Sequence, residues 1–153
     1  MALKWKIVTA LAVCFLAIQL IRPVVNRSEI SSGARFVELY RVPDTVNQLL
    51  RIACYDCHSN NTRYPWYADI QPVSSWLRSH ISEGKKELNF DEFDNYSDRK
   101  RLSKLKAIAD QVTDAKMPLA SYTWLHRDAR LSAAQKTVLT GWITQTIDSL
   151  QRR

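Results

Sequence analysis

The sequence has too few cysteines to build a disulfide scaffold. Of its three cysteines, Cys14 lies in an apolar N-terminal run, which leaves only Cys54 and Cys57 for the rest of the chain.

The sequence also lacks a large charge imbalance outside its N-terminus. Four of the 22 basic residues precede position 28, so residues 28–153 hold 18 basic against 15 acidic side chains. This small excess argues against nucleic-acid binding.

No stretch of the sequence alternates like a β-strand, and no internal repeat is present. A hydrophobic content of 46% nevertheless predicts a packed core. Apolar residues recur at helical spacing in four segments, which predicts an all-α fold. The expected helices run from Pro43 to Ala53, from Pro72 to Gly84, over 97–112, and from a capping box at Ser132 and Gln135 to the end of the chain.

The N-terminus carries a long uncharged run. Ile7 to Ile21 comprises 15 uncharged, mostly apolar residues between basic residues, a pattern typical of an export signal or a membrane anchor. No small residues mark a cleavage site after the run, which favours an uncleaved transmembrane helix. We therefore expect a membrane anchor or signal over 1–25, a tether over 26–41, and a compact domain over 42–153.

The most specific feature of the sequence is the pentapeptide Cys54-Tyr55-Asp56-Cys57-His58. Its spacing lets two thiols attach to the two vinyl groups of one haem while the adjacent imidazole reaches the iron. A redox-active disulfide is the competing interpretation, but such a disulfide is expected within a βαβ unit, and the sequence predicts no strands around the motif. Zinc would need a fourth ligand, and the other histidines form no spaced pair. The motif predicts one covalent haem c with His58 as an iron ligand.

Two residues compete for the sixth position on the iron. Methionine is the common partner in electron carriers, and Met117 is the only methionine besides the initiator. Pro118 interrupts any helix there, so the thioether is expected on a loop that can fold over the porphyrin. His80 is the alternative, because helical spacing places it on a buried face. Either residue could instead have a purely structural role, Met117 as an ordinary packed side chain and His80 as a hydrogen-bonded histidine.

Other side chains near the motif suit a porphyrin. The segment Tyr64-Pro65-Trp66-Tyr67 supplies flat apolar surface with polar tips, and Tyr64 and Trp66 in particular are expected to contact haem, although an aromatic core cluster explains them equally well. Arg63 and Arg78 could neutralise propionates. A basic run over 99–106 could steer an acidic redox partner, but a solvated helix face is the simpler interpretation.

Together these residues resemble a bacterial family, the small membrane-anchored haem-binding domain proteins of the monohaem c-type. The resemblance implies covalent haem in a cytochrome c-like helical domain, on the periplasmic side of the inner membrane behind a single-pass anchor. It rests on the pentapeptide and on Ser59–Thr62, Tyr64–Tyr67, Trp76, His80, Glu83–Phe90, Met117–Pro118, Tyr122, His126, Leu131–Ser132 and Trp142.

The predicted function is electron transfer, and the protein is expected to be an electron carrier that is not an enzyme. Its expected partners are other redox proteins, among them the subunits of a respiratory complex. Two alternatives stay open. One is a peroxidase-like or gas-binding haem protein with a labile sixth ligand. The other is a haem subunit whose task in a respiratory complex is structural.

Overall fold

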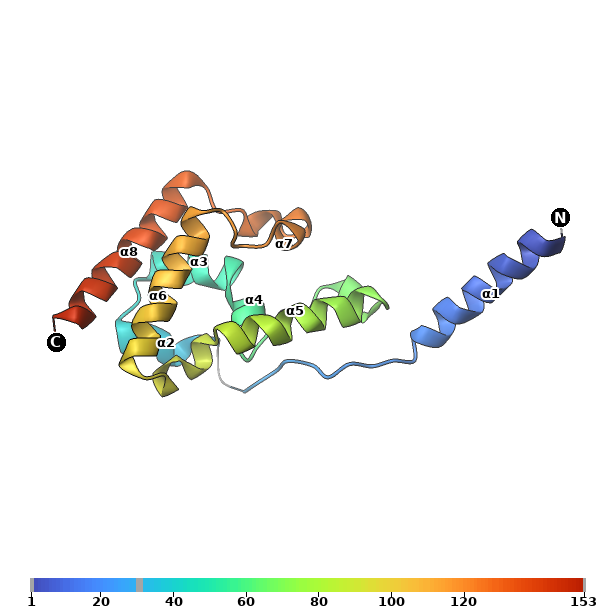
Figure 1. Ribbon diagram of the computed structural model, residues 1–153, viewed down its shortest axis with the longest axis horizontal. Helices are drawn as coiled ribbons and strands as arrows, with labels where there is room; N and C mark the ends of the chain where they lie inside the picture. The colour runs from blue at the N-terminus through green and yellow to red at the C-terminus, as the bar shows by residue number, and fades with distance from the viewer. Residues whose placement is uncertain (1, 30–31, 153) are drawn as a thin grey trace.

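The computed structural model describes residues 2–29 and 32–152, and these contain helices and turns but no strand (Figure 1). The prediction of an all-α fold is therefore confirmed. The α-helices in these ranges are α1 (Ala2–Ile18), α2 (Ala34–Tyr40), α3 (Asp44–Ala53), α4 (Tyr55–His58), α5 (Val73–Glu87), α6 (Asp98–Thr113), α7 (Ala120–Leu125) and α8 (Ala133–Gln151). Short 3-10 helices lie at η1 (Trp66–Asp69), η2 (Phe90–Asn95) and η3 (Arg127–Ala129).

The four helices expected from periodicity correspond to α3, α5, α6 and α8. The capping box of α8 is present: Gln135 N–H donates to Ser132 Oγ at 3.2 Å, and Ser132 N–H donates to Gln135 Oε1 at 2.8 Å. The second helix extends further than predicted, because α5 passes through Gly84 and ends at Glu87. Glycine weakens a helix interior but does not end it when packing favours the helix.

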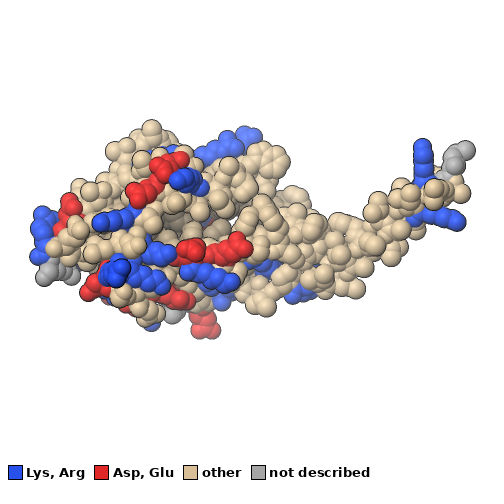
Figure 2. Space-filling model, in the orientation of Figure 1, with Lys and Arg blue, Asp and Glu red and all other residues tan. Residues whose placement is uncertain are grey.

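The expected transmembrane helix is a wrong prediction. Within the described residues, no helix is both long and apolar enough to cross a membrane. The 17 residues of α1 rise about 25 Å, which is less than the roughly 30 Å of a hydrocarbon core. The placement as a single-pass inner-membrane protein with a periplasmic domain is overturned with it. Figure 2 shows charged side chains interspersed over the helical domain and a mostly uncharged surface along the linker and α1.

Residues 34–40, inside the segment expected to be a tether, form α2 and contribute to the core. Phe36 is fully buried, and its ring lies 4.8 Å from Phe90 and 4.9 Å from Phe93, both edge-on. Gly33 begins α2 with φ +70°, and a side chain there would overlap the Tyr55 ring. A helix of seven residues spans two turns, too few to give a recognisable period.

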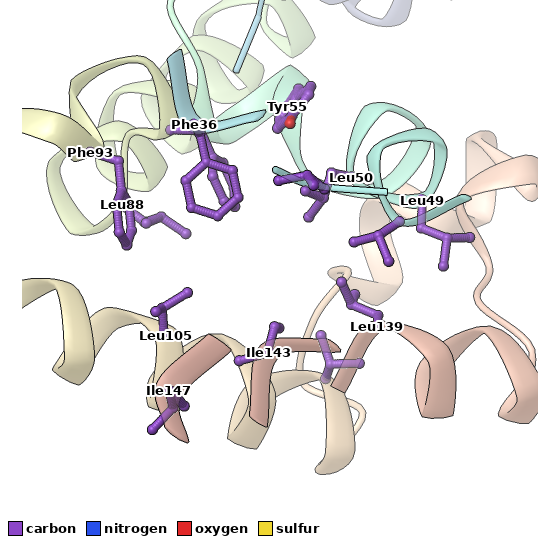
Figure 3. Close-up of a cluster of buried hydrophobic side chains, with 14 residues drawn as sticks. Phe36, Leu49, Leu50, Tyr55, Leu88, Phe93, Leu105, Leu139, Ile143 and Ile147 are labelled. Carbon is purple, nitrogen blue, oxygen red and sulfur yellow. The ribbon is translucent and has the colours of Figure 1, made fainter. Parts of the chain in front are cut away.

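The core lies where α6 and α8 pack against each other and against α3 (Figure 3). Leu105 of α6 and Leu139 and Ile143 of α8 face Leu50 of α3, and all four are fully buried. Each such side chain stabilises the fold by about 1.5–3 kcal/mol. This packing holds α3 in place, and the pentapeptide follows directly at its end.

Candidate haem site

The pentapeptide forms a helical turn of its own. α3 ends at Ala53, where the Cys54 amide donates to the Leu50 carbonyl at 2.9 Å. The backbone leaves the helical conformation at Cys54 (φ −128°, ψ −47°), and α4 follows as a single turn. The amides of Cys57 and His58 both donate to the Cys54 carbonyl, at 3.2 and 3.0 Å. The turn gathers two free, half-buried thiols and an imidazole on one short segment.

Hydrogen bonding fixes the proton of His58 on one ring nitrogen. Nδ1 lies 2.9 Å from the Gly84 carbonyl oxygen and 3.0 Å from that of Leu88. Carbonyl oxygens only accept, so Nδ1 carries the proton and Nε2 keeps its lone pair. Burial lowers the pKa of His58, against the opposing effect of the two backbone hydrogen bonds. A neutral imidazole oriented through Nδ1–H is the form that ligates a metal through Nε2.

Close packing of α5 against α4 makes these hydrogen bonds possible. A Cβ atom on Gly84 would lie 2.9 Å from the Cys57 carbonyl oxygen and 3.4 Å from both Cys57 Cβ and His58 Cε1. The first distance is shorter than real Cβ contacts, and a backbone oxygen cannot rotate away. The absence of a side chain at Gly84 therefore lets α5 bring its carbonyls to the imidazole.

Both thiols of the motif are held in the neutral form. Burial raises the pKa of Cys54 to about 12, with a smaller contribution from Cys57. Burial, and then the charge of Asp56, raises the pKa of Cys57 to about 11. A redox-active pair needs a lowered thiol pKa, and zinc needs thiolates. Within the described residues, no group of three or more His, Cys, Asp or Glu side chains is arranged so that it could bind a metal ion.

A buried carboxylate connects the motif to the C-terminal half of the chain. Asp56 is 6% exposed and accepts from Arg63 Nε at 3.2 Å and from the Tyr122 hydroxyl at 2.7 Å. Thr62 Oγ1 donates to the Asp56 backbone carbonyl at 2.6 Å. Burial raises the pKa of Tyr122, as does the hydrogen bond to Asp56, so the phenol stays a neutral donor. The sequence carries no signal for this network, because nothing in it pairs Asp56 with a residue 66 positions later.

An aromatic wall lies beside Cys57, and Tyr67 is the one aromatic side chain of the predicted segment that forms part of it. The Tyr122 and His126 rings stack at 4.2 Å with an interplanar angle of 10°, and the Tyr67 hydroxyl lies 2.6 Å from His126 Nε2. These three rings line a small cavity together with Cys57 and Leu77. Tyr122 and His126 were expected near the haem only through the family resemblance, because neither lies close to the pentapeptide in the sequence.

The other two aromatic residues of that segment, Tyr64 and Trp66, do not line this cavity. The Tyr64 hydroxyl accepts from the Asn26 amide at 2.8 Å, and the Arg78 guanidinium lies 4.7 Å above the Tyr64 ring. Trp66 is 79% exposed, with its ring edge-on to Tyr67 at 5.9 Å. Their roles as haem contacts stay predictions.

Met117 and His80, the candidate sixth ligands, are both half-buried. Met117 lies between α6 and α7, where its N–H donates to the Gln111 carbonyl at 3.0 Å. His80 lies on α5 with its ring 4.4 Å from that of Trp76. No hydrogen bond or ring contact within residues 2–29 and 32–152 joins either one to the motif. The choice between them stays a prediction.

A helical turn that presents two thiols and an oriented imidazole suits a small haem protein, since each of these groups has a partner on haem. A family model described as haem-binding domain matches residues 13–145, and the chain belongs to that family. Haem is accordingly the cofactor of the protein. No curated protein and no solved structure matches the chain.

Proposed function

We propose that the protein is a monohaem c-type electron carrier whose partners are other redox proteins. Cys54 and Cys57 would hold haem through thioether bonds, and His58 Nε2 would ligate the iron, which supplies one-electron redox chemistry. The observation that carries the proposal is the pair of hydrogen bonds from His58 Nδ1 to the carbonyls of Gly84 and Leu88. They orient the imidazole and leave Nε2 as the ligating atom.

Two properties of the thiols support covalent attachment. Both are free and lie on the same turn as His58, so one flat macrocycle could reach all three side chains. Both are neutral at physiological pH because burial raises the pKa of each thiol. The raised pKa values argue against the thiolate-dependent metal and disulfide chemistries that the same spacing serves elsewhere, which leaves attachment to haem as the remaining use of the pair.

Met117 is the proposed sixth ligand, which would keep the iron six-coordinate as an electron carrier requires. Two hydrogen bonds restrain the loop that carries Met117, one to α6 and one to the motif. Its own N–H is held at the end of α6, and Tyr122, five positions later, is hydrogen-bonded to Asp56. The loop between these two restraints is short, so the thioether is kept within a limited distance of the motif.

Covalent attachment can be tested by counting free thiols in the haem-loaded protein. The protein is unfolded, treated with iodoacetamide, and weighed by mass spectrometry. Thioethers at Cys54 and Cys57 leave Cys14 as the one cysteine that is alkylated. Cys54→Ala and Cys57→Ala should each lower the yield of haem protein, whereas the matched control Cys14→Ala should not. Three alkylated cysteines in a haem-loaded chain would contradict covalent attachment.

The ligand assignment is tested by optical spectra with added carbon monoxide. Met117→Ala should open the iron to carbon monoxide, and Met117→His should keep it six-coordinate at a lower reduction potential, because methionine favours ferrous iron. His80→Ala is the matched control and should leave the spectrum unchanged. A spectrum that responds to His80→Ala but not to Met117→Ala would assign the ligand to His80.

A further inference from the structure

A second cavity of about 800 Å³ lies on another side of α5, away from the pentapeptide. Its walls are α5, the linker at residues 24–28, the segment that follows the pentapeptide at Asn60 and Tyr64, η2 with its flanking residues, and the first turn of α6. Its volume falls in the range of sites that bind small molecules. We call it the basic groove, because five of its lining residues are cationic: Arg27, Arg78, Lys85, Lys86 and Lys100.

The charges of the basic groove are not balanced by carboxylates. Glu92 is the one acidic residue among the side chains that line it. None of the five cations forms a salt bridge with any residue that the structure describes. Arg78 and Lys100 instead lie over aromatic rings, with Lys100 Nζ 3.9 Å from the centre of the Tyr96 ring. The groove therefore keeps a large positive potential within a concave surface.

The wall formed by the linker is held in place by specific hydrogen bonds. The Asn26 side chain donates to the Ser59 carbonyl and to Thr62 Oγ1, both at 2.9 Å, and accepts from Lys85 Nζ at 2.7 Å. Arg78 donates to the Val24 carbonyl at 2.8 Å. Because these contacts fix both sides, the groove is a built feature of the fold.

The basic groove and the haem site use different faces of α5. Arg78, Ser82 and Lys85 are spaced at i, i+4 and i+7, so they share one face of the helix. Gly84, whose carbonyl accepts from His58, lies about 100° around the helix from Lys85. None of Cys54, Cys57 and His58 lines the groove, and Ile81 is the one residue that the groove shares with the small cavity beside Cys57.

We propose that the basic groove binds a small polyanion that carries at least two phosphate or carboxylate groups. Lysine and arginine donors form charge-assisted hydrogen bonds with both kinds of group. The side chains of Asn60 and Ser82 add neutral donors around the same space. The groove holds five cationic side chains and one carboxylate, so a ligand with a single negative charge would leave most of the positive charge unbalanced.

The test is isothermal titration of the haem-loaded, full-length protein at low ionic strength, with pyrophosphate and with citrate as separate probes. At least one probe should bind with a stoichiometry of one. Binding of pyrophosphate alone identifies a phosphorylated ligand, and binding of citrate alone identifies a polycarboxylate. Absence of binding by both probes would overturn the proposal.

Variants separate the groove from general surface charge. Lys86→Gln combined with Lys100→Gln should weaken binding at least tenfold, because two charge-assisted contacts are lost. Lys106→Gln, on the exposed side of α6 outside the groove, should change it less than twofold. Equal weakening by Lys106→Gln would overturn the proposal. Lys86→Gln alone, at a side chain with no described hydrogen bond, is used if the double variant does not fold.

Discussion

Replacing Gly84 by alanine tests the packing that orients His58, and Gly141 provides a matched control. Both glycines lie inside helices, so both substitutions gain the same helix propensity, about 1 kcal/mol. A Cβ at Gly141 meets no atom within 4 Å, whereas a Cβ at Gly84 lies 2.9 Å from the Cys57 carbonyl oxygen. The difference between the two variants therefore isolates the cost of crowding at α4.

Crowding of this kind costs about 1–3 kcal/mol. Gly141→Ala should stabilise the protein by about 0.4–1 kcal/mol, and Gly84→Ala should be less stable than Gly141→Ala by about 2 kcal/mol. In urea unfolding of the haem-loaded protein, followed by far-ultraviolet circular dichroism, the two midpoints should differ by about 1 M. Equal midpoints would show that α5 does not approach α4 closely, and the account of how His58 is oriented would fail.

Three further predictions follow from single contacts. Tyr122→Phe removes the donor to the Asp56 carboxylate and should lower the free energy of unfolding by about 1.5–3 kcal/mol in urea, whereas a loss below about 0.5 kcal/mol would show that the bond contributes little. Ser132→Ala breaks the capping box of α8 and should cost about 1 kcal/mol by the same measurement; an unchanged midpoint would contradict this. In the haem-free chain, Cys57 should react with iodoacetamide far more slowly at pH 8 than the exposed Cys14, because only the thiolate reacts. Its rate should rise about tenfold per pH unit up to its pKa of about 11, and a plateau near pH 9 would contradict burial of the thiol.

Periodicity predicted those parts of the fold that depend on long amphipathic helices. Val46, Leu49 and Leu50 repeat at helical spacing, and all three are buried in α3. Helical spacing also predicted that His80 lies on a buried face of α5, yet His80 is half-buried and Trp76, one turn earlier, is 50% exposed. An apolar stripe shows that a face is suited to burial, but it does not identify what covers that face.

Short elements and long-range contacts were not predictable in the same way. α2 and α7 have seven and six residues, too few for a period to be recognised. The pentapeptide marked Cys54, Cys57 and His58 as a group, and the structure places them on one turn. The acceptors of His58 Nδ1 are backbone carbonyls, which every residue has, so the sequence carried no signal for them.

The position of Asp56 between the two cysteines has a consequence for how the two sides of the cofactor are related. Its backbone belongs to the turn that carries His58, and its carboxylate holds Tyr122, the residue that restrains the loop after Met117. One carboxylate therefore connects the turn that would hold haem to the loop that would supply Met117. A displacement of α7 would be transmitted through Asp56 to the segment that carries Cys54, Cys57 and His58. Asp56 would thus keep two parts of the cofactor site in register although they lie far apart in the sequence.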